Sequence, residues 1–268
     1  MLCRLSLRSL GFAGASRQFV NLSGKPGFVM ASVDIGKKNA AYKAVDDWLK
    51  DGQTVGIGSG TTVVYVVDRI MELVKKSGLS ITCIPTSFQA LQLIKKARLP
   101  LSSMDDYPLL DVAFDGVDEI TPEFASIKGG GGCLIQEKIV DANSKYFIVV
   151  ADESKSSNYL GEHWKRGLPI EVIPMAVTPV KMEIERRFGG EANLRMAVAK
   201  MGPLLTDNGN FILDWKFVPS PSLDWNQVDI DLHMIPGVVG TGLFLGTAHQ
   251  AYLGKADGTV RVVKNPSH

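Results

Sequence analysis

The chain has 268 residues, of which 45% are hydrophobic and 21% are charged, and its formal net charge is +1. This length supports one large or two modest domains, and the near-neutral charge gives no reason to expect binding to nucleic acid or to an anionic membrane. The unpaired spacing of Cys3, Cys83 and Cys133 favours a reduced, intracellular protein. The four histidines form no metal-ligand pattern, so we expect no metal.

The first 33 residues differ from the rest of the chain. They hold three arginines, one lysine and many serines, but no acidic residue before Asp34. This composition is typical of a weak mitochondrial presequence, although an unprocessed or disordered extension fits it equally well. Met30 offers a second start. We expect a cytoplasmic protein, with a mitochondrial location as the alternative, and we find no stretch long enough for a membrane span.

From residue 37 onward, helix and strand patterns alternate. Residues 37–50 predict an amphipathic helix, because their apolar side chains recur at helical spacing. The next strands are expected at 54–58, 80–85, 99–104, 109–114 and 146–151, and the next helices at 61–76, 87–97 and 133–142. This alternation predicts a mainly parallel sheet with right-handed crossovers. Ligands collect beyond the carboxyl ends of such strands.

The pattern changes near Gly161. Further strands are expected at 168–173, 194–200 and 211–218, and helices at 180–188 and 222–233. The turn cluster at 206–210 joins two of these strands. The order of strand, helix, two strands and helix predicts a small α+β sandwich. Strands at 238–245 and around 254–263, with Asp257-Gly258 as a hairpin turn, are expected to return to the first domain.

Residues 115–137 carry more charge and glycine than a structural core needs. Asp115, Asp118 and Glu119 follow a buried-strand run, and Lys128 precedes four consecutive glycines. Glycines can expose backbone N–H groups and adopt positive φ without a Cβ penalty. Glu137 follows in the first turn of the next helix, near the positive end of the helix dipole. A carboxylate, a cation and a glycine cradle are the groups needed to move a proton beside a developing oxyanion.

The GIGSGTT segment at 56–62 joins a strand to a helix, where free N–H groups can bind an anion. The hydroxyls of Ser59, Thr61 and Thr62 suit a small phosphate ester. The segment has neither the third glycine of a dinucleotide fingerprint nor the ending of a nucleotide-binding P-loop. A tight, capped turn is the plainer interpretation.

The acidic motif and the later lysine also have plainer interpretations. Asp115 and Asp118 can bind Mg²⁺, accept hydrogen bonds from sugar hydroxyls, or cap a turn. Glu119 is expected to be a solvated or salt-bridged neighbour. Lys155 can contact a phosphate or hydroxyl, or be solvated, and Cys133 is expected to be a small helix residue and not a nucleophile.

Together these motifs resemble the A-type ribose-5-phosphate isomerases. The resemblance covers residues 37–264 and rests on GSGTT, DGVDEI, KGGGG, EK, ADESK, LPIEVIP, TDNGN and IPGVVGTGLF, in this order. It implies an α/β fold in which a Rossmann-like, mainly parallel sheet domain (34–160 plus 237–268) carries an inserted ferredoxin-like α+β domain (161–236), after the extension at 1–33. It also implies a phosphosugar substrate, no cofactor or metal, and a homodimer or homotetramer.

The resemblance places the family's proton acceptor on Glu137. It places substrate-binding residues on Ser59, Gly60, Thr61 and Thr62, on Asp115, Gly116, Val117 and Asp118, on Lys128, Gly129, Gly130 and Gly131, and on Lys155. Bacterial members often carry threonine where Ser59 stands, which keeps the hydroxyl. The N-terminal extension has no counterpart in the shorter members.

The implied activity is the metal-independent interconversion of D-ribose 5-phosphate and D-ribulose 5-phosphate, in the non-oxidative pentose phosphate pathway. Glu137 would move the C2 proton to C1 through a cis-enediolate, with Asp115 assisting ring opening and Lys128 stabilising the oxyanion. A glutamate with the reference pKa of about 4.3 would be ionised at neutral pH, and we expect this for Glu137.

Two other functions fit parts of the pattern. A CoA-transferase-like enzyme could use Glu137 as a nucleophile, but the hydroxyl-rich phosphate loop argues against it. A non-catalytic phosphosugar sensor could use the same site. The presence of Glu137 and the lack of a DNA-binding helical segment before residue 37 argue against that reading.

Overall fold

The computed structural model describes residues 32–220 and 223–268. The expected presequence and the second start at Met30 lie outside the described residues. Among the helices of the described part, none has the length and apolarity that crossing a membrane requires.

The larger sheet has six strands in the order β13-β12-β6-β3-β1-β2. They are β1 (Thr54–Ile57), β2 (Thr82–Pro85), β3 (Leu110–Asp115), β6 (Ser144–Asp152), β12 (Gln250–Gly254) and β13 (Val260–Lys264). All neighbours are parallel except β12 and β13, which pair antiparallel across the predicted turn at Asp257-Gly258. The predicted mainly parallel sheet is therefore confirmed.

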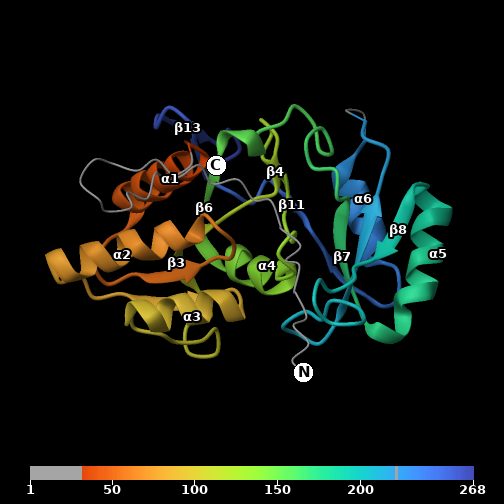
Figure 1. Ribbon diagram of the computed structural model, residues 1–268, viewed down its shortest axis with the longest axis horizontal. Coiled ribbons are helices and arrows are strands. Elements are labelled where there is room, and N and C mark those ends of the chain that lie inside the picture. The colour runs from red at the N-terminus through yellow and green to blue at the C-terminus, as the bar shows by residue number, and fades with distance from the viewer. Residues whose placement is uncertain (1–31, 221–222) are drawn as a thin grey trace, which may run out of the picture. The chain divides into compact units, whose positions relative to one another are not determined.

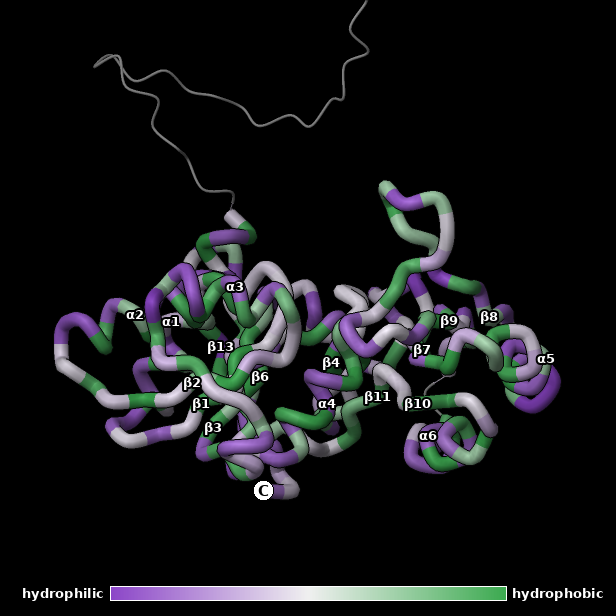
Figure 2. The backbone as a smooth tube through the Cα atoms, turned by 90° about the horizontal axis from the view of Figure 1, so that it is seen from below, coloured by the Kyte–Doolittle hydropathy of each residue, from purple (hydrophilic) through white to green (hydrophobic). Residues whose placement is uncertain are grey.

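Four helices accompany this sheet. They are α1 (Ser32–Trp48), α2 (Val63–Ser77), α3 (Phe88–Ala97) and α4 (Leu134–Ala142). Val63, Val66 and Val67 of α2 are buried with side chains of β1 and β3 in one apolar cluster. Against α4 the sheet packs so closely that a Cβ on Gly56 would lie 2.7 Å from Val140 Cγ1. Figure 2 shows the hydrophobic residues of the central strand β6 in green.

A second, antiparallel sheet has four strands in the order β10-β7-β9-β8. They are β7 (Leu168–Val172), β8 (Glu191–Leu194), β9 (Phe211–Lys216) and β10 (Val238–Thr241), with helices α5 (Val177–Phe188) and α6 (Trp225–His233) and the short 3-10 turn η2 (Pro174–Ala176). Side chains from β7, β9, α5 and α6 form a separate apolar cluster. In Figure 1, α5 and α6 lie with this sheet, α1, α2 and α3 lie with the larger one, and α4 lies between the two groups.

A third sheet of three short strands connects these groups. Its order is β11-β5-β4, with β4 (Glu119–Ile120), β5 (Ala125–Ile127) and β11 (Leu243–Leu245). The chain passes from β10 to β11 at Gly242, whose N–H donates to Pro169 O at 2.7 Å and whose carbonyl accepts from Lys128 N at 2.8 Å. A Cβ here would lie 2.3 Å from Lys128 O, so the crossing requires glycine.

Three predicted strands differ from the structure. Residues 99–104 form only one bridge, between Leu101 and Cys83, because the hydroxyls of Ser102 and Ser103 bind Asp106 and turn the chain. The strand expected at 194–200 lies earlier, at Glu191–Leu194, and its predicted continuation is a hairpin with Val198 exposed. The hydrophobic alternation of that hairpin does not reflect a buried face.

The strand expected at 238–245 is two strands in two different sheets. β10 pairs with β7 of the four-stranded sheet, and β11 pairs with β5. The segment is therefore not one strand, because the crossing at Gly242 separates its two halves. The domain limits at residues 160 and 237 stay a prediction.

Candidate active site

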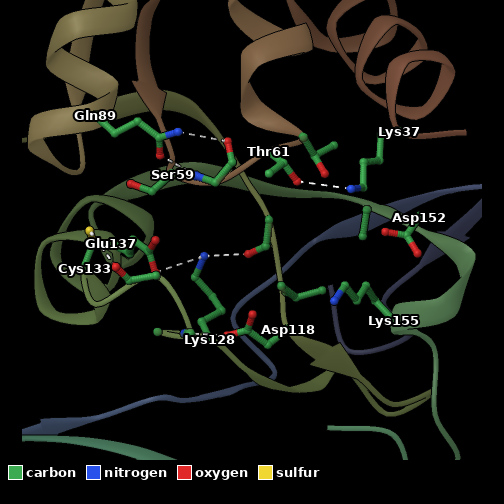
Figure 3. Close-up of a pocket in the computed structure, with 18 of the residues that line it drawn as sticks. Lys37, Ser59, Thr61, Gln89, Asp118, Lys128, Cys133, Glu137, Asp152 and Lys155 are labelled. Atoms are coloured by element: carbon green, nitrogen blue, oxygen red, sulfur yellow. Dashed lines mark hydrogen bonds and ion pairs between the residues drawn. The ribbon is translucent and has the colours of Figure 1, made fainter. Parts of the chain in front are cut away.

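Segments that follow β1, β3 and β6 meet at one edge of the large sheet. They border a cavity of about 390 Å³, and Figure 3 shows the side chains around it. All predicted site residues line the cavity except Asp115. The convergence expected from the parallel topology is therefore observed.

The loop after β1 is held by residues from two helices. Gly60 has a φ of +106°, and its N–H donates to Gln89 Oε1 at 2.8 Å. The Ser59 hydroxyl lies 2.6 Å from Ser87 Oγ, and Lys37 Nζ of α1 lies 3.2 Å from Thr61 Oγ1. The hydroxyls of this loop and the Lys37 ammonium group therefore lie at the same part of the cavity.

Lys37 and Gln89 line the cavity but were not predicted. Neither belongs to a motif, since Lys37 lies in an ordinary amphipathic helix and Gln89 lies in the first turn of α3. Only the assembled fold brings them to the loop.

Asp115 lies behind the cavity wall and is fully buried. Its Oδ1 accepts from the N–H groups of Ser59 and Gly116, at 3.0 and 2.6 Å. Its Oδ2 lies 2.7 Å from Lys128 Nζ. Asp115 thus ties two loops and the lysine together, and the structure does not bring it into the wall where a substrate would touch it.

Lys128 is only 2% exposed and lies among three carboxylates. Its Nζ donates to Gly116 O at 2.6 Å and lies 3.5 Å from Glu137 Oε2 and 3.9 Å from Asp141 Oδ2. Burial alone favours the neutral amine, but the Asp115, Glu137 and Asp141 carboxylates outweigh it and raise the pKa of Lys128. The lysine is therefore a fixed positive charge.

Glu137 lies in the first turn of α4 and is 5% exposed. Burial, reinforced by the negative charges of Asp115 and Asp118, raises its pKa to about 8, although Lys128 opposes the shift. The expectation of an ordinary glutamate pKa is therefore wrong. The sequence does not reveal this burial, because an isolated glutamate in a first helical turn is usually exposed.

Asp141, one turn after Glu137, was not predicted as part of this cluster. It is 3% exposed, and neither carboxylate oxygen has a hydrogen-bond partner among the described residues. Burial and the charges of Asp115 and Glu137 raise its pKa well above the ordinary value, against the effect of Lys128. The pattern of residues 133–142 offered no sign of it, since a helical aspartate is usually solvated.

The glycine loop is held at defined backbone angles. Gly129 and Gly132 have φ values of +93° and +86°, and Gly130 N donates to Asp118 Oδ2 at 2.6 Å. A Cβ on Gly130 would lie 2.6 Å from Asp118 Oδ1. These contacts explain why the loop needs glycine.

Three further predicted residues have clear surroundings. Lys155, in the 3-10 turn η1 (Glu153–Lys155), lines the cavity, and Figure 3 shows it opposite Glu137. Burial raises the pKa of the Cys133 thiol to about 12, in agreement with the expectation that it is no nucleophile. Glu119 is fully buried instead of solvated, and its carboxylate accepts from Ser157 Oγ at 2.7 Å and from His163 N at 2.6 Å.

In the described part of the chain, no three His, Cys, Asp or Glu side chains are grouped so that they could hold a metal ion. The carboxylates of Asp115 and Glu137 instead surround the Lys128 ammonium group.

A family profile decides the relationship of this chain to known proteins. The profile described as ribose 5-phosphate isomerase A (phosphoriboisomerase A) matches residues 82–258. The chain belongs to the ribose 5-phosphate isomerase A family. This confirms the resemblance stated from the motifs.

Relatives in the ribose 5-phosphate isomerase A family cover most of the chain. It is 50% identical to a ribose-5-phosphate isomerase of Homo sapiens over 237 residues, which cover 88% of this chain and 76% of the relative. It is 53% identical to the Dictyostelium discoideum ribose-5-phosphate isomerase over 232 residues, which cover 86% and 98%.

Solved structures agree with the fold. A D-ribose-5-phosphate isomerase in complex with phospho-erythronic acid superposes with a TM-score of 0.81 at 39% identity, covering 87% of this chain and 99% of that one. The ribose 5-phosphate isomerase of Plasmodium falciparum gives 0.81 at 34% identity, with the same coverage. The predicted α/β fold class is confirmed.

Proposed function

We propose that this chain interconverts D-ribose 5-phosphate and D-ribulose 5-phosphate, as expected of its family. One observation carries the proposal: a buried carboxylate, Glu137, lies 3.5 Å from a fixed ammonium group, Lys128, at the wall of a cavity that also contains an anion-binding loop. An isomerase that shifts a proton between adjacent carbons needs this combination.

Glu137 is the base in the proposed reaction. It takes the proton from C2 of the open-chain aldose, and the electron pair forms the C1–C2 double bond of a cis-enediolate as negative charge moves to the C1 oxygen. A proton then passes from the C2 hydroxyl to the C1 oxygen, and Glu137 returns its own proton to C1, so that C2 becomes the carbonyl carbon of the ketose. The atoms and electrons balance within one substrate molecule, and one carboxylate suffices because the two carbons are adjacent.

Lys128 and the glycine loop stabilise the enediolate. Lys128 and residues 129–131 line the cavity together with Glu137. Fixed charges and dipoles in a buried site stabilise a developing oxyanion without reorganisation. Asp115, being outside the wall, acts by holding Lys128 at 2.7 Å and not by touching the sugar. Asp118, which lines the cavity, binds sugar hydroxyls.

The phosphate group binds at the loop after β1. The hydroxyls of Ser59, Thr61 and Thr62 and the N–H groups of Thr61 and Thr62 receive it. Lys37 lies beside Thr61, and Lys155 lies across the cavity. Helix α2 begins directly after this loop, so its positive end adds to the attraction. A phosphate fixed there holds C2 near Glu137.

The decisive experiment measures isomerisation in EDTA for the wild type, Glu137→Gln and the exposed control Glu123→Gln. We expect the wild type and the control to be equally active, and Glu137→Gln to bind ribose 5-phosphate but turn it over roughly 10²–10⁴-fold more slowly. A wild type that binds the sugar without turnover would indicate a sensor. Equal rates for wild type and Glu137→Gln would assign the base to another residue.

Assembly and compartment are the remaining parts of the proposal. We expect a homodimer or homotetramer, because large apolar side chains such as Met175 and Met234 are exposed in the described chain. Sedimentation at micromolar concentration tests this, and a monomer would contradict it. We expect a cytoplasmic location, which imaging of the tagged full chain tests against a mitochondrial one.

A further inference from the structure

Arg195 follows β8 and reaches the active site from the four-stranded sheet. It is 7% exposed, and its Nε donates to Asp214 Oδ2 of β9 at 2.8 Å, while Nη2 contacts Oδ1 of the same carboxylate. This two-point contact fixes the plane of the guanidinium group. Its remaining nitrogen, Nη1, donates to Gly129 O at 2.9 Å and lies 3.4 Å from Gly130 O.

The glycine loop therefore has a cation on the carbonyl side of its peptides. In a trans peptide the C=O and the following N–H point in opposite directions. The Gly129 carbonyl accepts from Arg195, and the N–H of Gly130 in the same peptide donates to Asp118 Oδ2 at 2.6 Å. One peptide group thus links the Arg195–Asp214 pair to a carboxylate of the cavity wall.

The next peptide has the same orientation. The Gly130 carbonyl faces Arg195, so the N–H of Gly131 is directed away from it, and Gly131 lines the cavity. A positive charge on the carbonyl side polarises the peptide and strengthens its N–H as a donor.

We propose that Arg195 is a positioning residue for the isomerisation, which orients the Gly129–Gly131 peptides so that Asp118 and the loop N–H groups meet the sugar and its enediolate. This inference rests on the proposed function. Glycines lose more backbone freedom on ordering than other residues, so a loop of four needs an external clamp. Arg195 and Asp214 supply it from outside the segment that carries the motif.

The first test compares Arg195→Lys with the wild type. Lysine keeps the charge but loses the planar fork, so the peptides are held less well. We expect kcat/KM for ribose 5-phosphate to fall by about tenfold or more, because small misplacements in an active site cost up to roughly 10²-fold. The inhibition constant of inorganic phosphate should not change, because Arg195 does not contact residues 59–62.

A second variant separates positioning from folding. Removing Arg195 alone would leave the partly buried Asp214 unpaired, whereas replacing both members of such an ion pair with apolar residues is often neutral for stability. We expect the double variant Arg195→Met, Asp214→Leu to melt near the wild type, to bind phosphate normally and to lose roughly 10²-fold in kcat/KM. The control Arg186→Met, which removes an exposed ion pair with Glu183 on α5, should keep full activity.

The outcomes separate the two proposals. A folded double variant with wild-type kcat/KM overturns the role of Arg195 and leaves the proposed function intact. A wild type without isomerase activity overturns the proposed function itself. If the double variant does not fold, Arg195→Lys decides through kcat/KM and the inhibition constant of inorganic phosphate. A fall in kcat/KM with an unchanged inhibition constant supports the positioning role. Equal weakening of catalysis and of phosphate binding contradicts it.

Discussion

In the proposed reaction Glu137 must be ionised to accept the C2 proton, and its burial sets the pH at which it ionises. Because burial raises its pKa to about 8, the proton leaves the resting enzyme only near that pH. We expect kcat/KM to rise with pH through an acid limb centred near pH 8 and to level off above it. A limb near the ordinary glutamate value in the measured pH profile would contradict this prediction.

Asp141 should make the folded protein less stable as pH rises. Its pKa in the folded protein lies above the ordinary value, so the folded chain holds a proton that the unfolded chain releases. The free energy of unfolding therefore falls as pH increases above the ordinary aspartate range. Urea titrations at about pH 5 and about pH 8 should show a smaller loss for Asp141→Asn than for the wild type.

The exposed Asp105→Asn serves as the control for Asp141 and should lose stability as the wild type does. Equal pH dependence in all three proteins would mean that Asp141 holds no extra proton.

The residues predicted from sequence are those that carry their signal in short motifs. Asp118, Lys128 and Glu137 lie within one stretch, so glycine spacing and helix position sufficed to bring them together. Lys37 lines the same cavity from α1, and Arg195 contacts the glycine loop from the end of β8. No local pattern marks them, because their contacts depend on how separate elements pack.

The turn at residues 206–210 connects the four-stranded sheet to two helices of the site. Asp207 Oδ2 accepts from Phe88 N at the start of α3 at 2.8 Å. Asn208 Oδ1 accepts from Gln136 Nε2 of α4 at 2.9 Å, beside Glu137. The buried Glu171 holds the turn, accepting from Asn208 and Asn210 at 3.1 and 3.0 Å.

This turn should influence the rate without touching the substrate. We expect Asn208→Ala to lower kcat by about three- to tenfold, because α4 loses one support beside the base. Steady-state kinetics test this against Asp257→Ala, which alters the distant turn between β12 and β13. If the two variants have equal kcat values, the turn does not help to hold α4.

The prediction of helices and strands succeeded where the spacing of apolar residues in the sequence matched the burial of the element in the fold. Residues 146–151 are apolar throughout and form the buried strand β6. The alternation of residues 194–200 was misleading, since the side chains of this segment serve an exposed hairpin and the Arg195 clamp. A period-two pattern shows only that apolar and polar residues alternate. Whether the segment is a strand also depends on a neighbouring strand to pair with, which the local sequence does not reveal.

Helix α1 connects the packing of the large sheet to the loop after β1, where we propose that the phosphate binds. Gly36 lies against Gly254 of β12, where a Cβ on Gly254 would be 1.9 Å from Gly36 O. Lys37, the next residue, is the one beside Thr61. The approach of helix and strand therefore sets where this ammonium group lies.

Gly254→Ala should affect both properties. Overpacking of this kind costs about 1–3 kcal/mol, so we expect a lower melting temperature, and displacement of Lys37 should raise the KM for ribose 5-phosphate. Differential scanning fluorimetry and initial rates measure these effects. A wild-type melting temperature would show that α1 can shift without cost.

The parallel sheet and its ligand edge could be predicted for the molecule as a whole, because alternating strands and helices leave few topologies. The division of residues 238–245 between two sheets could not be predicted from the sequence. It depends on Gly242 meeting Pro169 and Lys128, and such a long-range fit has no counterpart in a local hydrophobic pattern.

The crossing at Gly242 has a consequence for genetics. Any side chain at Gly242 must displace the Lys128 carbonyl, which would lie 2.3 Å from the new Cβ. The backbone that carries the Lys128 ammonium group would move with it. In a genetic screen for loss of pentose phosphate isomerisation, we expect substitutions at Gly242 to be recovered together with substitutions at Glu137, the proposed base. A ranking of inherited variants by their distance from the bound substrate would wrongly class variants of Gly242 as harmless.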